Sequence, residues 1–435
     1  MKITMKRLII CLVLFIPGLI QAQTVLTLRN AIDTALKNNL DIQIAKNYVQ
    51  IARVSNTYGM ASGLPYINAS AGDNFSSDNI LQKYSASPES NQSGVLGNSV
   101  NAGVSANLVL FNGFKVLATK KRLSYLQTQS EIDLNGQVQD IIASVMLKYY
   151  DIIRQQSYIN IIQSSLDVSN KKLDIVNEKN SVGMANGTQI MQAQTDVNTA
   201  QQNLTVQQLI VEQEKNDLLT LMNSHSRSPI ILADSIQIDN TLVLDSIFSC
   251  LKRNPQLLSA EQQIRIDQQL VKEANAQRYP SLKLNAAYNF ARADNSSGSL
   301  LLNQVYGPTA GLTLQVPIFN GNTYHIQKIV AGLNVSNAKL GKENLYNSLT
   351  TNAVNKYLAY TNTLKQIESQ QKNFELAKKL VDLTLQNFQS GQATILDLKA
   401  AQESYENAAY QLVNFKYAAK TAEIELKQMI SQLSY

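Results

Sequence analysis

Residues 100–113 read VNAGVSANLVLFNG and alternate between apolar and polar side chains along most of their length. A period of two residues is typical of a β-strand whose two faces meet different surroundings. The same alternation recurs in residues 282–290, LKLNAAYNF, and in residues 312–318, LTLQVPI, and it is weaker in residues 67–71. Segments of about ten residues with one apolar face suit strands that cross a membrane around a wet interior. A soluble sandwich has comparable alternation, so the strands alone leave both architectures open.

The chain contains two copies of one unit. The motif LFNG at residues 110–113 recurs as IFNG at residues 318–321, and Gly183 recurs as Gly391, in both cases 208 positions later. A fixed offset between matching motifs indicates an internal repeat. We predict a first structural repeat over residues 23–224, an inter-repeat connection over residues 225–240 and a second structural repeat over residues 241–435.

Each copy is predicted to hold two strands and two long helices. From residue 190, and again from residue 398, apolar residues recur at alternating spacings of three and four, which is typical of helices that pack as a coiled coil. The predicted strands cover residues 65–76, 98–111, 280–291 and 308–319, and the predicted long helices cover residues 114–180, 188–222, 321–389 and 394–432. The Ser-rich and Asn-rich residues 77–97 and 292–304 are predicted as loops at the cell surface.

The four predicted strands of one chain are too few to close a barrel. Strand edges do not stay unpaired in lipid, because their backbone N–H and C=O groups would have no partner there. If the strands cross a membrane, several chains must share one barrel.

The N-terminus has the pattern of an export signal. Three basic residues precede an apolar run over residues 8–19, and a small residue, Ala22, follows it. A membrane-spanning helix needs about 20 residues, and this run is shorter. We therefore predict that residues 1–22 are a signal peptide. Because Cys11 lies within it, Cys250 is the one cysteine of the mature chain, and we expect neither a disulfide nor a lipid anchor.

The composition argues against an enzyme. Catalytic and metal sites need several titratable side chains that converge, whereas the sequence has two histidines, His225 and His325. It has no metal-ligand spacing, phosphate-binding glycine loop or nucleophile motif. The formal net charge of +6 includes the three basic residues of the leader and does not indicate a nucleic-acid partner. We expect no catalytic activity, no cofactor, no metal and no nucleic acid.

With these features the chain resembles the TolC family of outer-membrane efflux proteins over essentially its whole mature length. The resemblance rests on the duplicated unit, on Pro65 and Pro280 before the strands, and on two matching segments, residues 183–194 (GMANGTQIMQAQ) and residues 391–402 (GQATILDLKAAQ). It implies an α+β membrane protein in which three copies form a 12-stranded β-barrel, with four strands per chain, continued by a long α-helical coiled-coil barrel. It also implies a location in the cell outer membrane with an extension into the periplasm.

In this family the barrel is the passive exit duct of a tripartite efflux or type I secretion system. The resemblance therefore implies a homotrimer in outer-membrane lipid that receives substrates from an inner-membrane pump of RND or ABC type through a periplasmic adaptor, the membrane fusion protein. An alternative remains open, namely a periplasmic coiled-coil adaptor or scaffold without a pore. Such a protein would share the leader and the heptads but not two matched pairs of amphipathic strands.

The resemblance also implies roles for particular residues. The two glycine segments would form the turns at the periplasmic tip, where the adaptor docks and the duct closes. The predicted adaptor-docking turns are Val182, Gly183 and Met184 in the first copy and Ser390, Gly391 and Gln392 in the second. The predicted channel constriction residues are Asp397, Gln189 and Phe388, and the predicted strand-entry and turn residues are Pro65, Pro280, Gly113 and Gly321.

Plainer interpretations of these residues stay open. A glycine in a helix hairpin can be required by backbone geometry alone, because positive φ suits glycine, and a single Asp on a helix is often solvated surface. Where the family's closing network often has an Arg and a second acidic residue, this chain has Ala393 and Ala400. The constriction of this chain therefore departs from that network.

Overall fold

The computed structural model describes residues 24–83, 85, 88–224, 230–232, 234–298 and 300–433. The predicted signal peptide and His225 lie outside the described residues. The chain divides into two compact units. Unit 1 comprises Met1–Ile44, Gly136–Asn254 and Ser348–Tyr435, and unit 2 comprises Ala45–Asn135 and Pro255–Asn347.

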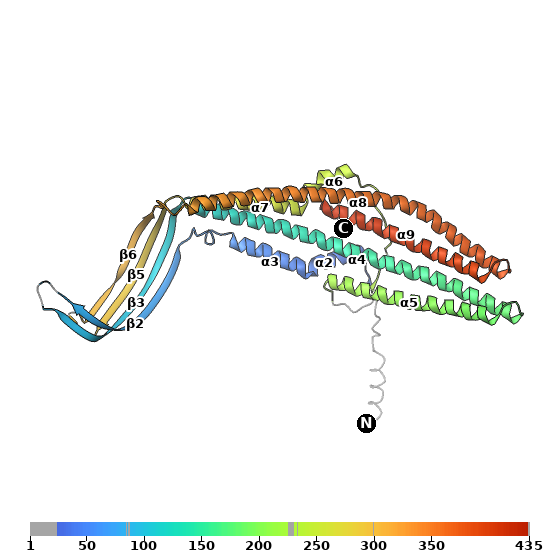
Figure 1. Ribbon diagram of the computed structural model, residues 1–435, viewed down its shortest axis with the longest axis horizontal. Coiled ribbons are helices and arrows are strands. Elements are labelled where there is room, and N and C mark those ends of the chain that lie inside the picture. The colour runs from blue at the N-terminus through green and yellow to red at the C-terminus, as the bar shows by residue number, and fades with distance from the viewer. Residues whose placement is uncertain are drawn as a thin grey trace, which may run out of the picture. The chain divides into compact units, whose positions relative to one another are not determined.

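Unit 2 contains an antiparallel sheet of four strands in the order β2, β3, β5, β6. The strands are β2 (Tyr66–Gln82), β3 (Ser90–Asn112), β5 (Ser281–Asn295) and β6 (Leu302–Gln315), and Figure 1 shows them side by side. Two hairpins are joined through β3 and β5, where Ala106 lies opposite Ala286. Pro65 and Pro280 directly precede β2 and β5, where the missing N–H of a proline removes no ladder hydrogen bond. The edge strands of the sheet are β2 and β6.

At the hairpin ends, the four strands extend farther than the alternation of apolar and polar residues predicted. Only residues 83–89 separate β2 from β3, and only residues 296–301 separate β5 from β6. The predicted surface loops at residues 77–97 and 292–304 are therefore too long. Polar side chains do not prevent pairing here, because the ladder is built from backbone N–H and C=O groups.

β6 also ends earlier than predicted. The expected range was 308–319, but the strand runs from Leu302 to Gln315. Pro317 follows two residues later and has no N–H to donate to a ladder. The whole strand therefore lies closer to the N-terminus of the chain than predicted.

Glycines lie at the two places where a strand is followed by a long helix. Gly113 has a φ of +66° and Gly321 a φ of +63°, a region that suits glycine because it has no Cβ. At Gly113 space is also limiting, because a Cβ there would lie 2.5 Å from the carbonyl oxygen of Ala276. The repeated motif at these positions therefore forms a strand-to-helix turn.

The long helices come in two pairs of equal length. α4 (Lys115–Ser181) and α8 (Thr323–Gln389) have 67 residues each, and α5 (Gly187–Leu221) and α9 (Ile395–Met429) have 35 residues each. The ends of all four helices lie within three residues of the predicted ranges. Their matching lengths support the interpretation of the chain as two copies of one unit, which stays a prediction.

Shorter elements complete the fold. They are β1 (Thr24–Val25), α2 (Leu28–Asn38), α3 (Leu40–Ser55), β4 (Ile230–Ile231), α6 (Leu244–Leu251) and α7 (Pro255–Ala276). β1 and β4 pair in parallel. Among the helices of the described residues, none has both the length and the apolar character needed to cross a membrane.

The heptad stripes are the buried faces of α5 and α9. Ala193, Leu204 and Leu218 of α5 and Leu398 and Leu412 of α9 are at most 6 % exposed. Residues three and four positions apart lie on one face of a helix, so their spacing alone identifies the face that packs.

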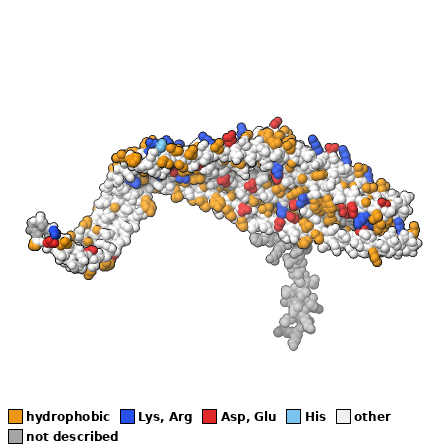
Figure 2. All heavy atoms as spheres, viewed as in Figure 1, with side chains coloured by type: hydrophobic (Ala, Val, Ile, Leu, Met, Phe, Trp, Pro, Cys, Tyr) orange, Lys and Arg blue, Asp and Glu red, His pale blue; other side chains and the backbone are white. Residues whose placement is uncertain are grey.

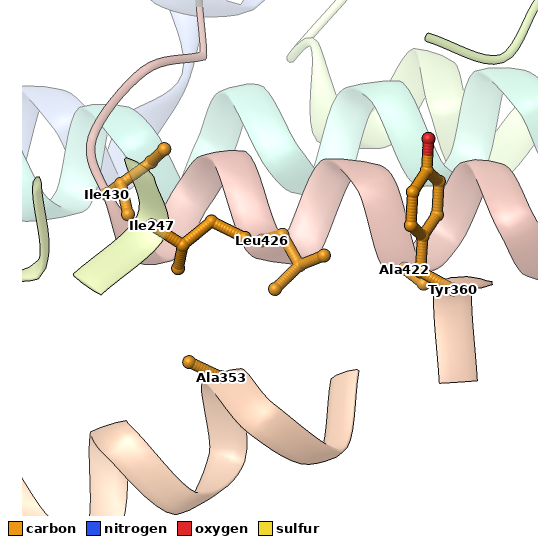
Figure 3. Close-up of a cluster of buried hydrophobic side chains, with 6 residues drawn as sticks. All are labelled: Ile247, Ala353, Tyr360, Ala422, Leu426 and Ile430. Carbon is orange, nitrogen blue, oxygen red and sulfur yellow. The ribbon is translucent and has the colours of Figure 1, made fainter. Parts of the chain in front are cut away.

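Figure 3 shows an apolar cluster in unit 1 at which α6, α8 and α9 meet. Its buried members are Ile247, Ala353, Tyr360, Ala422, Leu426 and Ile430. The hydroxyl of Tyr360 donates a hydrogen bond to the backbone carbonyl of Asp239, which satisfies the polar end of a buried aromatic side chain. The cluster therefore holds the segment before α6 against the two long helices.

Candidate functional site

Two similar turns join the long helices of unit 1. Residues 182–186 connect α4 to α5, and residues 390–394 connect α8 to α9. In the first turn the N–H of Met184 donates to the carbonyl of Lys179 at 2.7 Å, and the N–H of Gly183 donates to the carbonyl of Asn180 at 3.0 Å. This pair of hydrogen bonds is the Schellman motif, which ends a helix on a residue with positive φ.

The second turn repeats the motif. The N–H of Gln392 donates to the carbonyl of Asn387 at 2.7 Å, and the N–H of Gly391 donates to the carbonyl of Phe388 at 3.2 Å. Gly183 and Gly391 have φ values of +78° and +80°. Apart from the glycine and its two chain neighbours, no atom of the described residues lies within 4 Å of the place where a Cβ would stand on either glycine. Backbone conformation, and not lack of space, therefore requires glycine in these two turns, which we call the tip turns because each lies at the tip of a helix hairpin.

A capping box starts the helix that follows each turn. In α5 the side chain of Asn186 accepts the N–H of Gln189 at 3.0 Å, and the side chain of Gln189 accepts the N–H of Asn186 at 3.1 Å. In α9, Thr394 and Asp397 make the equivalent pair, at 3.2 Å and 2.8 Å. The predicted constriction residues Gln189 and Asp397 therefore hold equivalent positions and cap their helices.

Electrostatics favour the ionised form of Asp397. The backbone N–H of Thr394, and next its hydroxyl, donate to the carboxylate, and they hold the pKa of Asp397 below its usual value. The side chain is exposed. Each chain therefore presents one carboxylate in the first turn of α9 and a neutral amide at the same place in α5.

Apolar side chains surround the two turns. Val182 and Met184 are 69 % and 72 % exposed. Met191 in the first turns of α5 and Leu396 in the first turn of α9 are 73 % and 71 % exposed, and sequence reasoning missed both. Ser390, Gly391 and Gln392 are exposed as well. Large apolar side chains gathered at an exposed site indicate contact with another molecule.

Phe388 differs from the other predicted site residues because its ring is buried. It is 5 % exposed and packs with Ile175, Val176, Ala193 and Leu398. The ammonium of Lys179 lies 4.4 Å from the ring centroid and donates to the backbone carbonyl of Phe388. These contacts come from α4, α5 and α9, and Phe388 itself belongs to α8. Phe388 therefore joins the hairpin α4–α5 to the hairpin α8–α9 and does not lie on an exposed surface of the chain.

Beyond this cluster, polar contacts hold α4 against α5 within one hairpin and connect that hairpin with α9 of the other. The ammonium of Lys172 lies 2.5 Å from a carboxylate oxygen of Asp196, and its side chain is 1 % exposed. Asp196 also lies 3.7 Å from the ammonium of Lys399. The side-chain amide of Gln402 donates to the hydroxyl of Ser169 at 3.0 Å. A cavity of about 330 Å³ adjoins these groups between α4, α5 and α9. No group of three or more His, Cys, Asp or Glu in the described part of the chain could hold a metal ion.

Comparison with known proteins identifies the family. The family model described as outer membrane efflux protein matches residues 31–224 and 247–432. The chain belongs to the outer membrane efflux protein family. A curated relative of this efflux protein, the toluene efflux pump outer membrane protein TtgC of Pseudomonas putida, is 22 % identical over 411 residues, which cover 92 % of this chain and 81 % of TtgC. The cation efflux system protein CusC of Escherichia coli is 20 % identical over 407 residues, which cover 92 % of this chain and 85 % of CusC.

Solved structures show the same fold. The CmeC outer membrane channel of Campylobacter jejuni is similar with a TM-score of 0.75 and 19 % identity, over 94 % of this chain and 87 % of CmeC. The outer membrane protein VceC of Vibrio cholerae is similar with a TM-score of 0.72 and 16 % identity, over 93 % of this chain and 95 % of VceC. The predicted family, the fold class apart from its two internal repeats, and the outer-membrane location of this efflux protein are confirmed. Its family consists of transport channels rather than enzymes.

Proposed function

We propose that three copies of this efflux protein form the exit duct of a tripartite efflux or type I secretion assembly, which receives substrates from an inner-membrane pump of RND or ABC type through a periplasmic adaptor. The observation that carries the proposal is the open sheet, since the order β2-β3-β5-β6 leaves the outer edges of β2 and β6 without a partner strand among the described residues. In lipid each unpaired backbone group costs several kcal/mol. Three chains of four strands would close one 12-stranded barrel by pairing β6 of one copy with β2 of the next.

Exposed apolar stripes support the same assembly. Tyr48 and Ile51 of α3 are 62 % and 56 % exposed, and Leu333 and Leu340 of α8 are 59 % and 61 % exposed. Leu333 and Leu340 are one heptad apart, which is the spacing of a seam that accepts another helix. Figure 2 shows hydrophobic side chains, in orange, at the surface where Figure 1 draws α8. Neighbouring copies in a trimer would cover these faces.

The tip turns support contact with an adaptor. Val182, Met184, Met191 and Leu396 expose apolar side chains around two rigid, capped helix hairpins. A helical hairpin of an adaptor with its own apolar tip would remove them from water. At the same end, Asp397 and Gln189 would line the constriction. Phe388 is not part of this lining, because its ring is buried in the chain.

The names of the relatives all describe efflux or export, but they specify different substrates. TtgC is named for toluene efflux, CusC for cation efflux, and OpmQ of Pseudomonas aeruginosa for pyoverdine export. Similar chains thus accompany chemically unrelated substrates, which supports a passive duct. Family membership gives no support to the alternative of an adaptor without a pore.

Two measurements test the proposal. Native mass spectrometry of the full chain in mild detergent should give particles of three chains, and a stable monomer with an intact sheet would refute the trimer. In a Cys250→Ala background, Val182→Cys should cross-link to an adaptor in cells. Glu368→Cys is the matched control, because this exposed residue of α8 lies about 30 Å along the helix from the second turn. Equal cross-linking at both sites would exclude docking at the tip.

A further inference from the structure

A cavity of about 620 Å³ lies in unit 2 where the sheet meets the helices. Its walls come from the start of α4, from the second half of α7 and from one residue of α8, Lys328. Gly113 at the end of β3 and Tyr279 just before β5 both line it. The cavity therefore adjoins the ends of two strands of the sheet, at the level where a membrane-embedded sheet would emerge into the periplasm.

Three lysines give this cavity a positive charge. Lys121, Lys272 and Lys328 line it, and its lining residues include no Asp or Glu. The carboxylate of Glu273, next to Lys272 in sequence, is held by Arg122 at 2.7 Å. Residues 113–130 contain four basic residues and no acidic one. The local charge is therefore strongly positive, although the net charge of the whole chain is small.

Besides the polar Gln269 and Asn275, the cavity has exposed apolar side chains in its wall. Phe114, Leu117 and Tyr279 are 66 %, 55 % and 51 % exposed. A site for a free inorganic anion gains nothing from such neighbours, whereas a phospholipid has a phosphate beside acyl chains. Figure 2 shows blue and orange side chains together where Figure 1 draws the junction of the strands with α7 and α8. Lysine stems can lie along apolar surface while the ammonium groups reach lipid phosphates.

We propose that this cavity binds the headgroup of an anionic phospholipid from the periplasmic leaflet of the outer membrane. The three ammonium groups contact the lipid phosphate, and Phe114, Leu117 and Tyr279 contact the start of the acyl chains. The bound lipid fixes the depth of the strand-to-helix turn at Gly113 in the membrane. The inference rests on the outer-membrane location and is independent of the proposed pump and adaptor.

Lipid titration monitored by native mass spectrometry tests the site, with the full chain in mild detergent and phosphatidylglycerol as the probe. The test variant combines Lys121→Gln, Lys272→Gln and Lys328→Gln. The control variant combines Lys365→Gln, Lys378→Gln and Lys379→Gln, which remove the same charge from exposed positions of α8. A lysine near a membrane surface strengthens binding of anionic lipid about fivefold, so the test variant should bind on the order of 100-fold more weakly. The control variant should bind as the wild type does.

Further arms of the experiment separate lipid from other anions. Leu117→Asn should weaken binding of phosphatidylglycerol while all three lysines remain, and inorganic phosphate at the same concentration should not displace the lipid. Lys272→Gln alone should weaken binding about fivefold and is the variant to use if the triple variant misfolds. If the test and control variants lose phosphatidylglycerol binding equally, the loss reflects the overall charge of the protein, and the proposed site is wrong. Displacement by inorganic phosphate would also overturn the lipid assignment.

Discussion

Asp397 accepts a hydrogen bond from the backbone N–H of Thr394 at 2.8 Å, so the residue predicted to line the constriction also caps the helix that carries it. Gln189 makes the same contact with Asn186 at the matching position of α5. One position thus combines a local structural role with a predicted electrostatic role. The two roles separate in experiments, because an amide and a carboxylate both cap but only the carboxylate is charged.

A change of charge at Asp397 or at Gln189 should change the ion selectivity of the duct. Asp397→Asn is expected to lower the preference of the duct for cations, and Gln189→Glu is expected to raise it, because symmetry would repeat each charge three times around the pore. Both substitutions keep an oxygen that can cap the helix. Reversal potentials in single-channel recordings, and block by multivalent cations from the periplasmic side, measure the effect. If neither variant changes selectivity, the two residues only cap their helices.

The selectivity should also depend on pH in a defined direction. Hydrogen bonds from Thr394 lower the pKa of Asp397, so the charge persists above the folded-state pKa and is lost as the pH falls through it. Cation preference should therefore persist to a pH below about 4, the pH at which an ordinary Asp loses its charge. Recordings over a pH series measure this. Loss of selectivity well above that pH would show that the three carboxylates lie close enough to raise one another's pKa.

Alanine at the tip glycines should loosen the turns. Gly183→Ala or Gly391→Ala places a Cβ on a residue with positive φ, which costs about 1–2 kcal/mol. Gly187→Ala is the matched control, because Gly187 is helical and no atom lies within 4 Å of its Cβ position. Amide hydrogen exchange around the turn should be faster than in the wild type in the first two variants. In the control it should be as fast as in the wild type or slower. Equal exchange in all three would contradict the requirement for glycine.

Patterns with a fixed local spacing could be read from the sequence. The heptad positions of α5 and α9 are buried because a spacing of three and four defines one face of any helix. The alternating residues of β3 and β5 form a ladder, and the glycines of the repeated motif have positive φ. The capping boxes could have been found in the same way, since Asn186 and Thr394 each precede a capping partner by three residues.

Features that depend on contacts between distant segments could not be predicted from the sequence. Phe388 matched a constriction residue by position, but its ring is buried because four helices meet around it, and the sequence does not specify which faces meet. The pair Lys172 and Asp196 is hidden for the same reason. The ends of β2 and β3 depend on backbone pairing and not on side-chain alternation, so polar residues of these strands were interpreted as loop.

Removal of the Phe388 ring should separate the hairpins. Phe388→Ala leaves a cavity among α4, α5, α8 and α9 and removes the contact with Lys179, which costs about 3–5 kcal/mol of local stability. Leu383→Ala, at a residue of the same helix that is 59 % exposed, should cost much less. Hydrogen exchange of the first turns of α5 and α9 measures local opening, and single-channel conductance measures any effect on closure. Similar exchange in both variants would contradict the role of Phe388 in joining the hairpins.

The ion pair between Lys172 and Asp196 should respond unequally to loss of either partner. Lys172→Met leaves Asp196 near Lys399 and with a hydrogen bond from Gln192 at 3.0 Å, so the remaining charge is compensated. Asp196→Asn leaves a buried ammonium without the carboxylate that pairs with it, and such a loss typically costs about 3–5 kcal/mol.

We therefore expect Asp196→Asn to lower the free energy of local opening more than Lys172→Met, as measured by hydrogen exchange over the adjacent parts of α4 and α5. The double variant Lys172→Met with Asp196→Leu removes both charges and should recover most of the loss, because two apolar side chains replace a pair that is costly to desolvate. Additive losses in the double variant would show that the two residues act independently. In that case the packing of α4 against α5 depends on the apolar cluster around Phe388 instead, to which both helices contribute.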